Sequence, residues 1–209
     1  MYQSKISPEN IPDFPNIVVS VLTNACTHKC VFCQYKDYSK HSDYIRMNMT
    51  RNIFYKIVDN MTGIRNTILR LCAWGEPLLH PDIVDFVKYA TSKKVKSVLL
   101  SNGYPLTPEL SFSLMKAGLN FAEISIDAAK VETYRKIRVC DDEDAFYKVK
   151  DNLNRTVTIR NKYTFSTKIV TIYVAWPNKE SEVEFIDFKK DWSGIVDDIL
   201  KMTLHSFMC

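Results

Sequence analysis

The chain has 209 residues, enough for one domain with a full hydrophobic core or for a short α/β barrel. Apolar residues make up 46% and charged residues 25%, which excludes a disordered, collagen-like or fibrous protein. The net charge of +4 is scattered and gives no strong nucleic-acid signal, and no apolar run is long enough to cross a membrane. We therefore expect a globular, cytoplasmic protein.

Short apolar runs alternate with helical patterns from one end of the chain to the other. Nearly continuous apolar runs are typical of parallel strands that are covered on both faces. The pattern therefore predicts repeated strand–helix units. The predicted strands are 17–22, 67–73, 96–100, 121–126, 166–175 and 195–204.

The predicted helices between these strands follow from apolar spacing and from capping residues. Thr50, Thr107 and Asn178 are candidate N-caps, and Pro81 stands at a first helical position. The helices are expected from Thr50 to Met61, Pro81 to Ala90, Thr107 to Gly118, Val131 to Ile137, Asp144 to about Arg160 and Lys179 to about Lys190.

This order of elements predicts a partial (β/α)6 barrel of parallel strands with outer helices. Strand–helix–strand crossovers are almost always right-handed, and a run of them curls the sheet. A flat, doubly wound sheet is the alternative. No repeat, low-complexity tract or Gly/Ser linker divides the chain, so we expect a single domain over 1–209 with residues 1–15 as a lead-in.

The strongest chemical signal is a run of cysteines after the first predicted strand, Cys26-Thr27-His28-Lys29-Cys30-Val31-Phe32-Cys33. Three thiolates on one loop can ligate three irons of a [4Fe–4S] cluster, which normally takes four cysteines, so the fourth iron stays open. An amino acid can chelate that iron, and S-adenosylmethionine would then place its sulfonium beside a one-electron donor. The alternative is a structural zinc site with His28 or His41 as fourth ligand.

Polar groups also follow three other predicted strands. They are Gly75-Glu76-Pro77 after the second, Ser101-Asn102-Gly103 after the third, and Ser125 and Asp127 at the end of the fourth, with Arg138 shortly beyond. Each alone is also typical of a turn or of solvated surface. Together they lie at the C-terminal ends of successive strands, where barrel enzymes build their active sites.

From about Phe14 to the C-terminus, these segments resemble the radical S-adenosylmethionine (radical SAM) enzyme superfamily. The resemblance is to the core barrel of members with C-terminal auxiliary-cluster (SPASM-type) domains. It implies that Cys26, Cys30 and Cys33 hold a catalytic [4Fe–4S] cluster with S-adenosyl-L-methionine beside it.

The same resemblance implies a binding role for each of the other motif residues. Phe32 would pack near the adenine, Gly75-Glu76-Pro77 would receive the methionine amino group, and Asn102 would also line the cofactor site. The remaining implied cofactor contacts are Ser125 and Asp127 at the ribose, Arg138 at the methionine carboxylate and Asn178 facing the cofactor.

The resemblance further implies an oxidoreductase or modifying enzyme that cleaves S-adenosylmethionine reductively to a 5'-deoxyadenosyl radical. That radical would abstract hydrogen from a substrate, expected to be a peptide side chain or a sugar-like small molecule. The implied electron donor is a flavodoxin or ferredoxin. The alternatives are a zinc-stabilised binding module without catalytic activity and an inactive, truncated core.

The chain also departs from the family pattern. Thr27 stands where relatives often have Asn, Trp74 stands where Gly is frequent, and residues 139–144 lack the glycines that relatives often carry. Auxiliary-cluster relatives continue past the sixth strand with more cysteines, so the sequence is either a minimal barrel or a fragment without that domain.

The remaining cysteines have competing interpretations. Cys72 is expected to be a buried apolar residue. Cys140 is a candidate hydrogen-atom donor or an inert thiol, and Cys209 is a candidate ligand of an auxiliary cluster or part of a frayed terminus. Residues 34–47 form either part of a substrate lid or a polar loop.

Overall fold

The computed structural model describes residues 13–72 and 74–204. Within this part of the chain, one sheet of six parallel strands runs in the order β1-β2-β3-β4-β5-β6. The strands are β1 (Ile17–Ser20), β2 (Ile68–Leu71), β3 (Lys96–Ser101), β4 (Phe121–Ser125), β5 (Lys168–Ala175) and β6 (Asp198–Thr203). The strand order confirms the predicted α/β partial barrel, because a doubly wound sheet would reverse direction partway.

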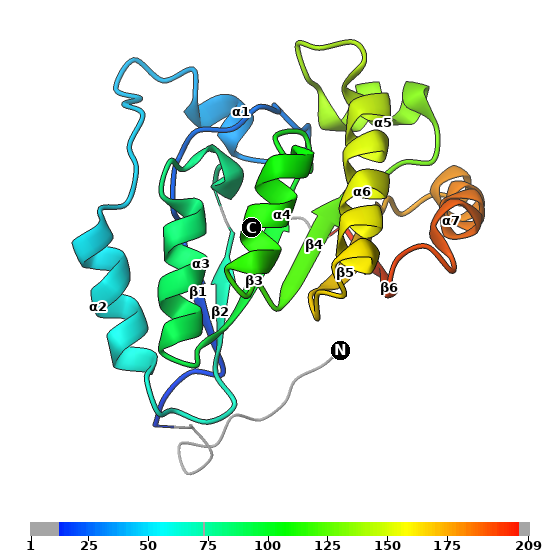
Figure 1. Ribbon diagram of the computed structural model, residues 1–209. Helices are drawn as coiled ribbons and strands as arrows, with labels where there is room; N and C mark the ends of the chain where they lie inside the picture. The colour runs from blue at the N-terminus through cyan, green and yellow to red at the C-terminus, as the bar shows by residue number, and fades with distance from the viewer. Residues whose placement is uncertain (1–12, 73, 205–209) are drawn as a thin grey trace.

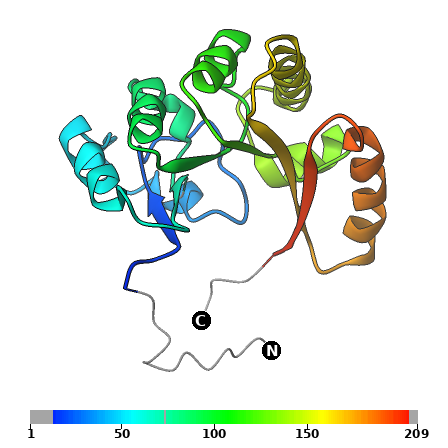
Figure 2. The ribbon, with the colours of Figure 1, turned by 60° about the horizontal axis from the view of Figure 1, so that its bottom comes forward.

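Helices connect the strands, and the longer ones cover one face of the sheet. They are α1 (Tyr35–Tyr38), α2 (Arg51–Met61), the 3-10 helix η2 (Pro77–Leu79), α3 (Ile83–Ser92), α4 (Pro108–Lys116), α5 (Val131–Arg138), α6 (Ala145–Lys162) and α7 (Lys179–Trp192). The longer helices stand in front of the sheet in Figure 1. Figure 2 shows that the sheet curls with these helices on its convex side. Strands β1 and β6 are the two edges of the described sheet, so the barrel is open between them.

The hydrophobic core fills the space between the convex face of the sheet and the helices. Leu69, Leu71 and Ile124 are 0% exposed there, and Phe54 of α2 stacks on Phe86 of α3 with ring centroids 4.0 Å apart. Side chains alternate between the faces of a strand, so residues 68, 70 and 123 point toward the concave face. On β1 that face is open, since Val19 is 53% exposed.

Some element boundaries differ from those predicted. Strand β6 begins at Asp198 rather than at residue 195, because the amides of Ile195 and Val196 donate to the Trp192 carbonyl and complete the turn after α7. Helix α3 begins two residues after Pro81. The lead-in up to residue 12, the predicted strand end at Ala73, and Cys209 lie outside the described residues.

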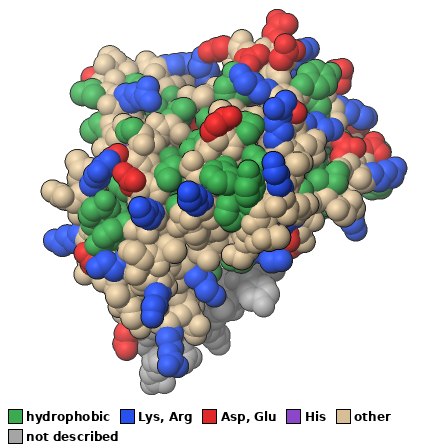
Figure 3. Space-filling model, in the orientation of Figure 1, with side chains coloured by type: hydrophobic (Ala, Val, Ile, Leu, Met, Phe, Trp, Pro, Cys, Tyr) green, Lys and Arg blue, Asp and Glu red, His purple; other side chains and the backbone are tan. Residues whose placement is uncertain are grey.

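The helix-covered face carries no concentrated charge of one sign. Figure 3 shows basic and acidic side chains intermingled with hydrophobic ones on this face. None of the described helices combines the length and the apolar character that crossing a membrane requires.

Candidate functional site

The three motif cysteines lie in the loop between β1 and α1, beyond the C-terminal end of β1. Cys30 is buried and Cys26 and Cys33 are half-buried, and all three are free thiols. The loop is paired with the segment around the end of α5, because Lys29 N donates to Val139 O at 2.8 Å and Val31 N donates to Ile137 O at 2.9 Å. Residues from the far half of the chain therefore hold the cysteine loop, which we define as residues 24–33.

Cys26 and Cys30 are protonated thiols in the metal-free protein. Burial raises the pKa of Cys26 to about 12 and also raises the pKa of Cys30, where Arg138 opposes the effect. Metal binding at these sulfurs must therefore displace protons.

A single metal ion and an iron–sulfur cluster place different demands on three cysteine sulfurs. In the described part of the chain, no three His, Cys, Asp or Glu side chains converge closely enough to hold one metal ion. A zinc ion would draw its sulfur ligands to within about 4 Å of one another. In a [4Fe–4S] cluster each cysteine binds a different iron and no such convergence is needed.

His28 cannot act as a fourth zinc ligand in this arrangement. The ring is 1% exposed, Nδ1 lies 2.9 Å from Thr27 Oγ1, and Nε2 lies 2.8 Å from Tyr134 Oη. Burial lowers the pKa of His28 to about 3, so the imidazole is neutral. Both ring nitrogens are engaged, while the other candidate, His41, is exposed beyond α1.

Gly75 brings the segment after β2 against the cysteine loop. Its φ is +117°, and a Cβ built on it would lie 2.1 Å from Thr23 O and 2.9 Å from Ala25 O. The next residue is fixed by its backbone, since Glu76 N donates to Ala25 O at 2.7 Å. Only glycine permits this approach, and Pro77 then begins η2.

The carboxylate of Glu76 is buried and held by three donors. Oε1 accepts from Leu78 N at 3.1 Å and from Ser101 Oγ at 2.8 Å, and Oε2 accepts from Asn102 N at 2.8 Å. Burial raises the pKa of Glu76 to about 7 against the effect of these donors. The ion pairs of the described residues do not include Glu76. An ammonium group from a ligand would supply the missing partner, so this site fits the amino end of S-adenosylmethionine.

Asn102 joins the end of β3 to the cysteine loop. Its Nδ2 donates to Thr27 Oγ1 at 3.0 Å and lies 3.7 Å from Cys26 Sγ, while its Oδ1 accepts from Tyr104 N at 3.0 Å. The predicted contacts at Glu76 and at the cysteines therefore lie side by side.

Asp127 and Arg138 form a buried ion pair, with side chains 0% and 7% exposed. Burial disfavours the charge on Arg138, but Asp127 outweighs it and raises the pKa of the guanidinium, which stays charged. Arg138 Nη1 lies 3.7 Å from Cys30 Sγ, and the guanidinium carbon lies 5.6 Å from the centroid of the Phe32 ring. Its Nε is buried without a hydrogen-bond partner among the described residues, so this N–H is left to donate to a ligand carboxylate.

The other predicted cofactor residues differ in how deeply they are buried. Phe32 is half-buried, with its ring centroid 6.5 Å from that of Trp176 in an edge-to-face arrangement. Ser125 is the half-buried last residue of β4. Asn178 is exposed, and its Oδ1 accepts from Ser181 N at 2.8 Å as the N-cap of α7. The structure therefore shows the predicted N-cap role of Asn178, and its predicted contact with the cofactor stays a prediction.

Sequence reasoning missed Trp176, the first residue after β5. Its Nε1 is buried and has no hydrogen-bond partner in the described part of the chain. The only signal for it was its position at a strand end.

Cys140 pairs with His28 in an antiparallel bridge, and its Sγ lies 3.5 Å from Thr27 O. Cys72 is half-buried rather than buried, because it follows the last residue of β2 on the concave side.

One ion pair lies on the concave face of the sheet, between Arg70 of β2 and Glu123 of β4. Their side chains are 30% and 13% exposed. Apart from this pair, the concave face of these strands is largely apolar, as in Ile68, Val98, Leu100 and Val170. The pair is therefore a polar feature within an apolar wall.

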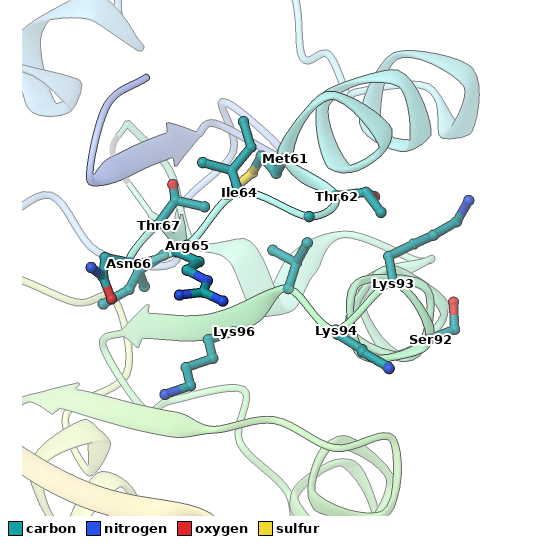
Figure 4. A pocket seen from close by; sticks show the side chains of 13 residues that line it. Met61, Thr62, Ile64, Arg65, Asn66, Thr67, Ser92, Lys93, Lys94 and Lys96 are labelled. Carbon is teal, nitrogen blue, oxygen red and sulfur yellow. The ribbon is translucent and has the colours of Figure 1, made fainter. Parts of the chain in front are cut away.

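A cavity of about 850 Å³ lies away from all of these residues, between the turns that precede β2 and β3. Figure 4 shows Arg65, Lys94 and Lys96 among the side chains around it. Helices α2 and α3 end at this cavity, and their C-terminal dipoles attract such cations. The basic lining is thus explained by the fold, and the cavity contains none of the predicted site residues.

The family model described as "Radical SAM superfamily" matches residues 20–179. An AdoMet-dependent heme synthase of Methanosarcina barkeri (strain Fusaro / DSM 804) is 32% identical over 124 residues, which are 59% of this chain and 34% of the relative. A GTP 3',8-cyclase of Clostridium perfringens (strain 13 / Type A) is 26% identical over 170 residues, which are 79% of this chain and 49% of the relative. The chain thus spans about a third to a half of the length of these curated relatives.

Solved structures show the same fold. Methylornithine synthase (PylB) has a TM-score of 0.65 at 16% identity, with 90% of this chain and 53% of that chain covered. SuiB of Streptococcus suis, bound to S-adenosylmethionine, has a TM-score of 0.70 at 15% identity, with 95% of this chain and 43% of that chain covered.

Proposed function

Because the chain belongs to the radical SAM superfamily, whose members use a [4Fe–4S] cluster and S-adenosylmethionine, we propose that it forms the core of such an enzyme. When bound, the cluster supplies the electron that cleaves S-adenosylmethionine to methionine and a 5'-deoxyadenosyl radical, which takes a hydrogen atom from the substrate. The chain's own residues bind and orient both cofactors.

Each predicted residue receives a role that agrees with its surroundings. Cys26, Cys30 and Cys33 ligate the cluster, and Glu76 accepts the methionine ammonium. Arg138 donates to the methionine carboxylate, with Asp127 fixing its guanidinium. The other contacts are Phe32 and Asn102 beside the cofactor, Ser125 near the ribose, Gly75 and Pro77 around the amino group, and the amide nitrogen of Asn178 at the rim.

The observation that carries this proposal is the buried carboxylate of Glu76. Three donors orient it, and one of them, the backbone N–H of Asn102, belongs to a residue whose side chain reaches Cys26 Sγ. A buried carboxylate is costly without a cation, and a ligand ammonium beside the cluster would compensate it.

The substrate is proposed to bind against the concave face. Its apolar wall and the Arg70–Glu123 pair favour a substrate that combines apolar surface with a polar group, such as a peptide side chain or a sugar-like molecule. The relatives act on different molecules, as their names show, and SuiB has been crystallised with a precursor peptide. A flavodoxin or ferredoxin is the proposed electron donor, and residues 1–209 are proposed to be a single core domain.

Electron paramagnetic resonance of anaerobically reconstituted, dithionite-reduced protein tests the proposal. We expect a reduced [4Fe–4S] signal that changes when S-adenosylmethionine is added and that is lost in Cys30→Ala. A cluster signal that does not change when S-adenosylmethionine is added would contradict the proposed cofactor site. Tightly bound zinc without iron or sulfide would support the binding-module alternative instead.

A further inference from the structure

A partly buried series of hydrogen bonds passes through the cysteine loop, and the family pattern does not explain it. It runs from Tyr134 of α5 through His28 and Thr27 to Asn102 at the end of β3. The backbone N–H of Asn102 then donates to Glu76 Oε2 at 2.8 Å. These hydrogen bonds thus connect α5, the cysteine loop and the carboxylate proposed to hold the methionine ammonium.

We propose that Thr27 and His28 are positioning residues that couple the cysteine loop to Glu76. They fix the distance between the cluster-binding sulfurs and the amino-binding carboxylate. This inference rests on the proposed function, because it concerns how that function's two cofactors are held relative to each other.

Every polar group in this series has a partner. Asn102 Nδ2 donates to Thr27 Oγ1. A neutral His28 ring carries one N–H, so it donates at one ring nitrogen and accepts at the other, with Thr27 Oγ1 beside Nδ1 and Tyr134 Oη beside Nε2. Either tautomer satisfies both contacts, so the series links the four side chains without an unpaired donor.

The surroundings leave His28 little freedom to move. Its ring makes edge-to-face contacts with Tyr104 and Tyr134, with centroids 5.8 Å and 5.9 Å away. Its backbone pairs with Cys140, and its amide lies 3.5 Å from Cys26 Sγ. A rigid imidazole beside the first cysteine is suited to orienting a ligand of the cluster, as partners of metal ligands commonly do.

Thr27→Val is the direct test, since it removes the hydroxyl and keeps the shape of the side chain. We expect cluster-loaded Thr27→Val to keep its iron and sulfide content but to bind S-adenosylmethionine roughly three- to tenfold more weakly, the loss expected for one hydrogen bond. We also expect the paramagnetic signal with S-adenosylmethionine to differ from that of the wild type. In the cluster-free protein, hydrogen exchange should rise in residues 24–33 and 75–79 together.

Substitutions at His28 separate its two bonds. Asn at position 28 can reach Thr27 but not Tyr134, whereas Gln can reach Tyr134 but not Thr27. We expect His28→Asn to retain more of the wild-type affinity for S-adenosylmethionine than His28→Gln does. Equal affinities in the two variants would overturn the coupling through Thr27.

Thr156→Val is the matched control. It removes the buried 2.7 Å hydrogen bond between Ser111 and Thr156, which joins α4 to α6 away from the site. It should lower thermal stability without changing the affinity or the spectrum. If Thr27→Val behaves in the same way, the inference is wrong. A wild-type protein that binds neither cofactor would contradict the proposed function itself, which keeps the two failures distinct.

Discussion

Gly75 lies directly against the carbonyl of Thr23, which is why a side chain cannot be placed at this position. A Cβ on residue 75 would lie 2.1 Å from Thr23 O, at a φ of +117°. We expect Gly75→Ala to destabilise the protein by about 3 kcal/mol, because strain and overlap combine. Binding of S-adenosylmethionine should also fall, since Glu76 would be displaced.

Gly63→Ala separates strain from overlap. Gly63 has a φ of +81°, but its Cβ would meet nothing within 4 Å. The cost should be only about 1 kcal/mol. Thermal denaturation would show the difference as a melting temperature roughly 4–8 °C lower for Gly75→Ala than for Gly63→Ala. Equal melting temperatures would contradict the close approach.

The cysteines should divide into two groups by their effect on iron content. Cys26→Ala, Cys30→Ala and Cys33→Ala should each abolish the stable four-iron cluster, because each removes a ligand. Cys72→Ala and Cys140→Ala should retain iron and acid-labile sulfide near the wild-type level. Chemical assay of both elements checks this, and cluster loss in Cys72→Ala would require a different ligand set.

Glu76 should make the stability of the cluster-free protein depend on pH. Burial raises the pKa of Glu76 from 4.5 to about 7. Between these values the folded protein holds a proton that the unfolded chain releases, so stability is full below about pH 4.5 and falls as the pH rises through about 7. The loss is at most roughly 3 kcal/mol.

Urea unfolding at pH 5 and pH 8 measures how much of the free energy of unfolding depends on the protonation of Glu76. Glu76→Gln should show a smaller fall in unfolding free energy between the two pH values than the wild type. Glu132→Gln, at an exposed position of α5, should behave like the wild type. An unchanged pH dependence in Glu76→Gln would contradict the assignment.

Breaking the Asp127–Arg138 pair should be costly, because both side chains are buried. Asp127→Asn or Arg138→Met leaves one charge without a partner and should destabilise the protein by about 3–5 kcal/mol. The double variant should recover part of that loss. Asp191→Asn, which breaks the more exposed pair with Lys150, should cost less than about 1 kcal/mol. Denaturant unfolding of the four variants tests the comparison, and additive losses would argue against a direct interaction.

Arg70 should affect the substrate but not the cofactor. It lies on the concave face with Glu123, and no hydrogen bond or ion pair joins its side chain to the cysteine loop among the described residues. We expect Arg70→Met to cleave S-adenosylmethionine without substrate at a rate within about twofold of the wild type. Production of 5'-deoxyadenosine under dithionite measures this rate. A collapse of that rate would place Arg70 in the cofactor site.

Much of the fold could be predicted, because the strands are apolar runs whose order decides the sheet. Helix α7 is an example, since Asn178 was recognised as its N-cap and does accept from Ser181 N. The short elements α1 and η2 could not be predicted, because four or three residues show no apolar period.

The site was harder to predict than the fold, because its contacts join distant segments. The motif pointed to Glu76 and Arg138, but nothing local to Thr27 indicates Asn102, which lies 75 residues away. Likewise, the φ of +62° at Asp127 results from its contacts with Val174 and Arg138 rather than from a turn sequence.

The pairing of the cysteine loop with the end of α5 sets the order of events during synthesis. Tyr134 is 106 residues beyond His28, and Arg138 is 108 residues beyond Cys30. A nascent chain therefore exposes its three thiols long before the segment that shields them has been translated. The cysteine loop reaches its final surroundings only after α5 has been made and has docked, and until then oxidation of the exposed thiols competes with cluster binding.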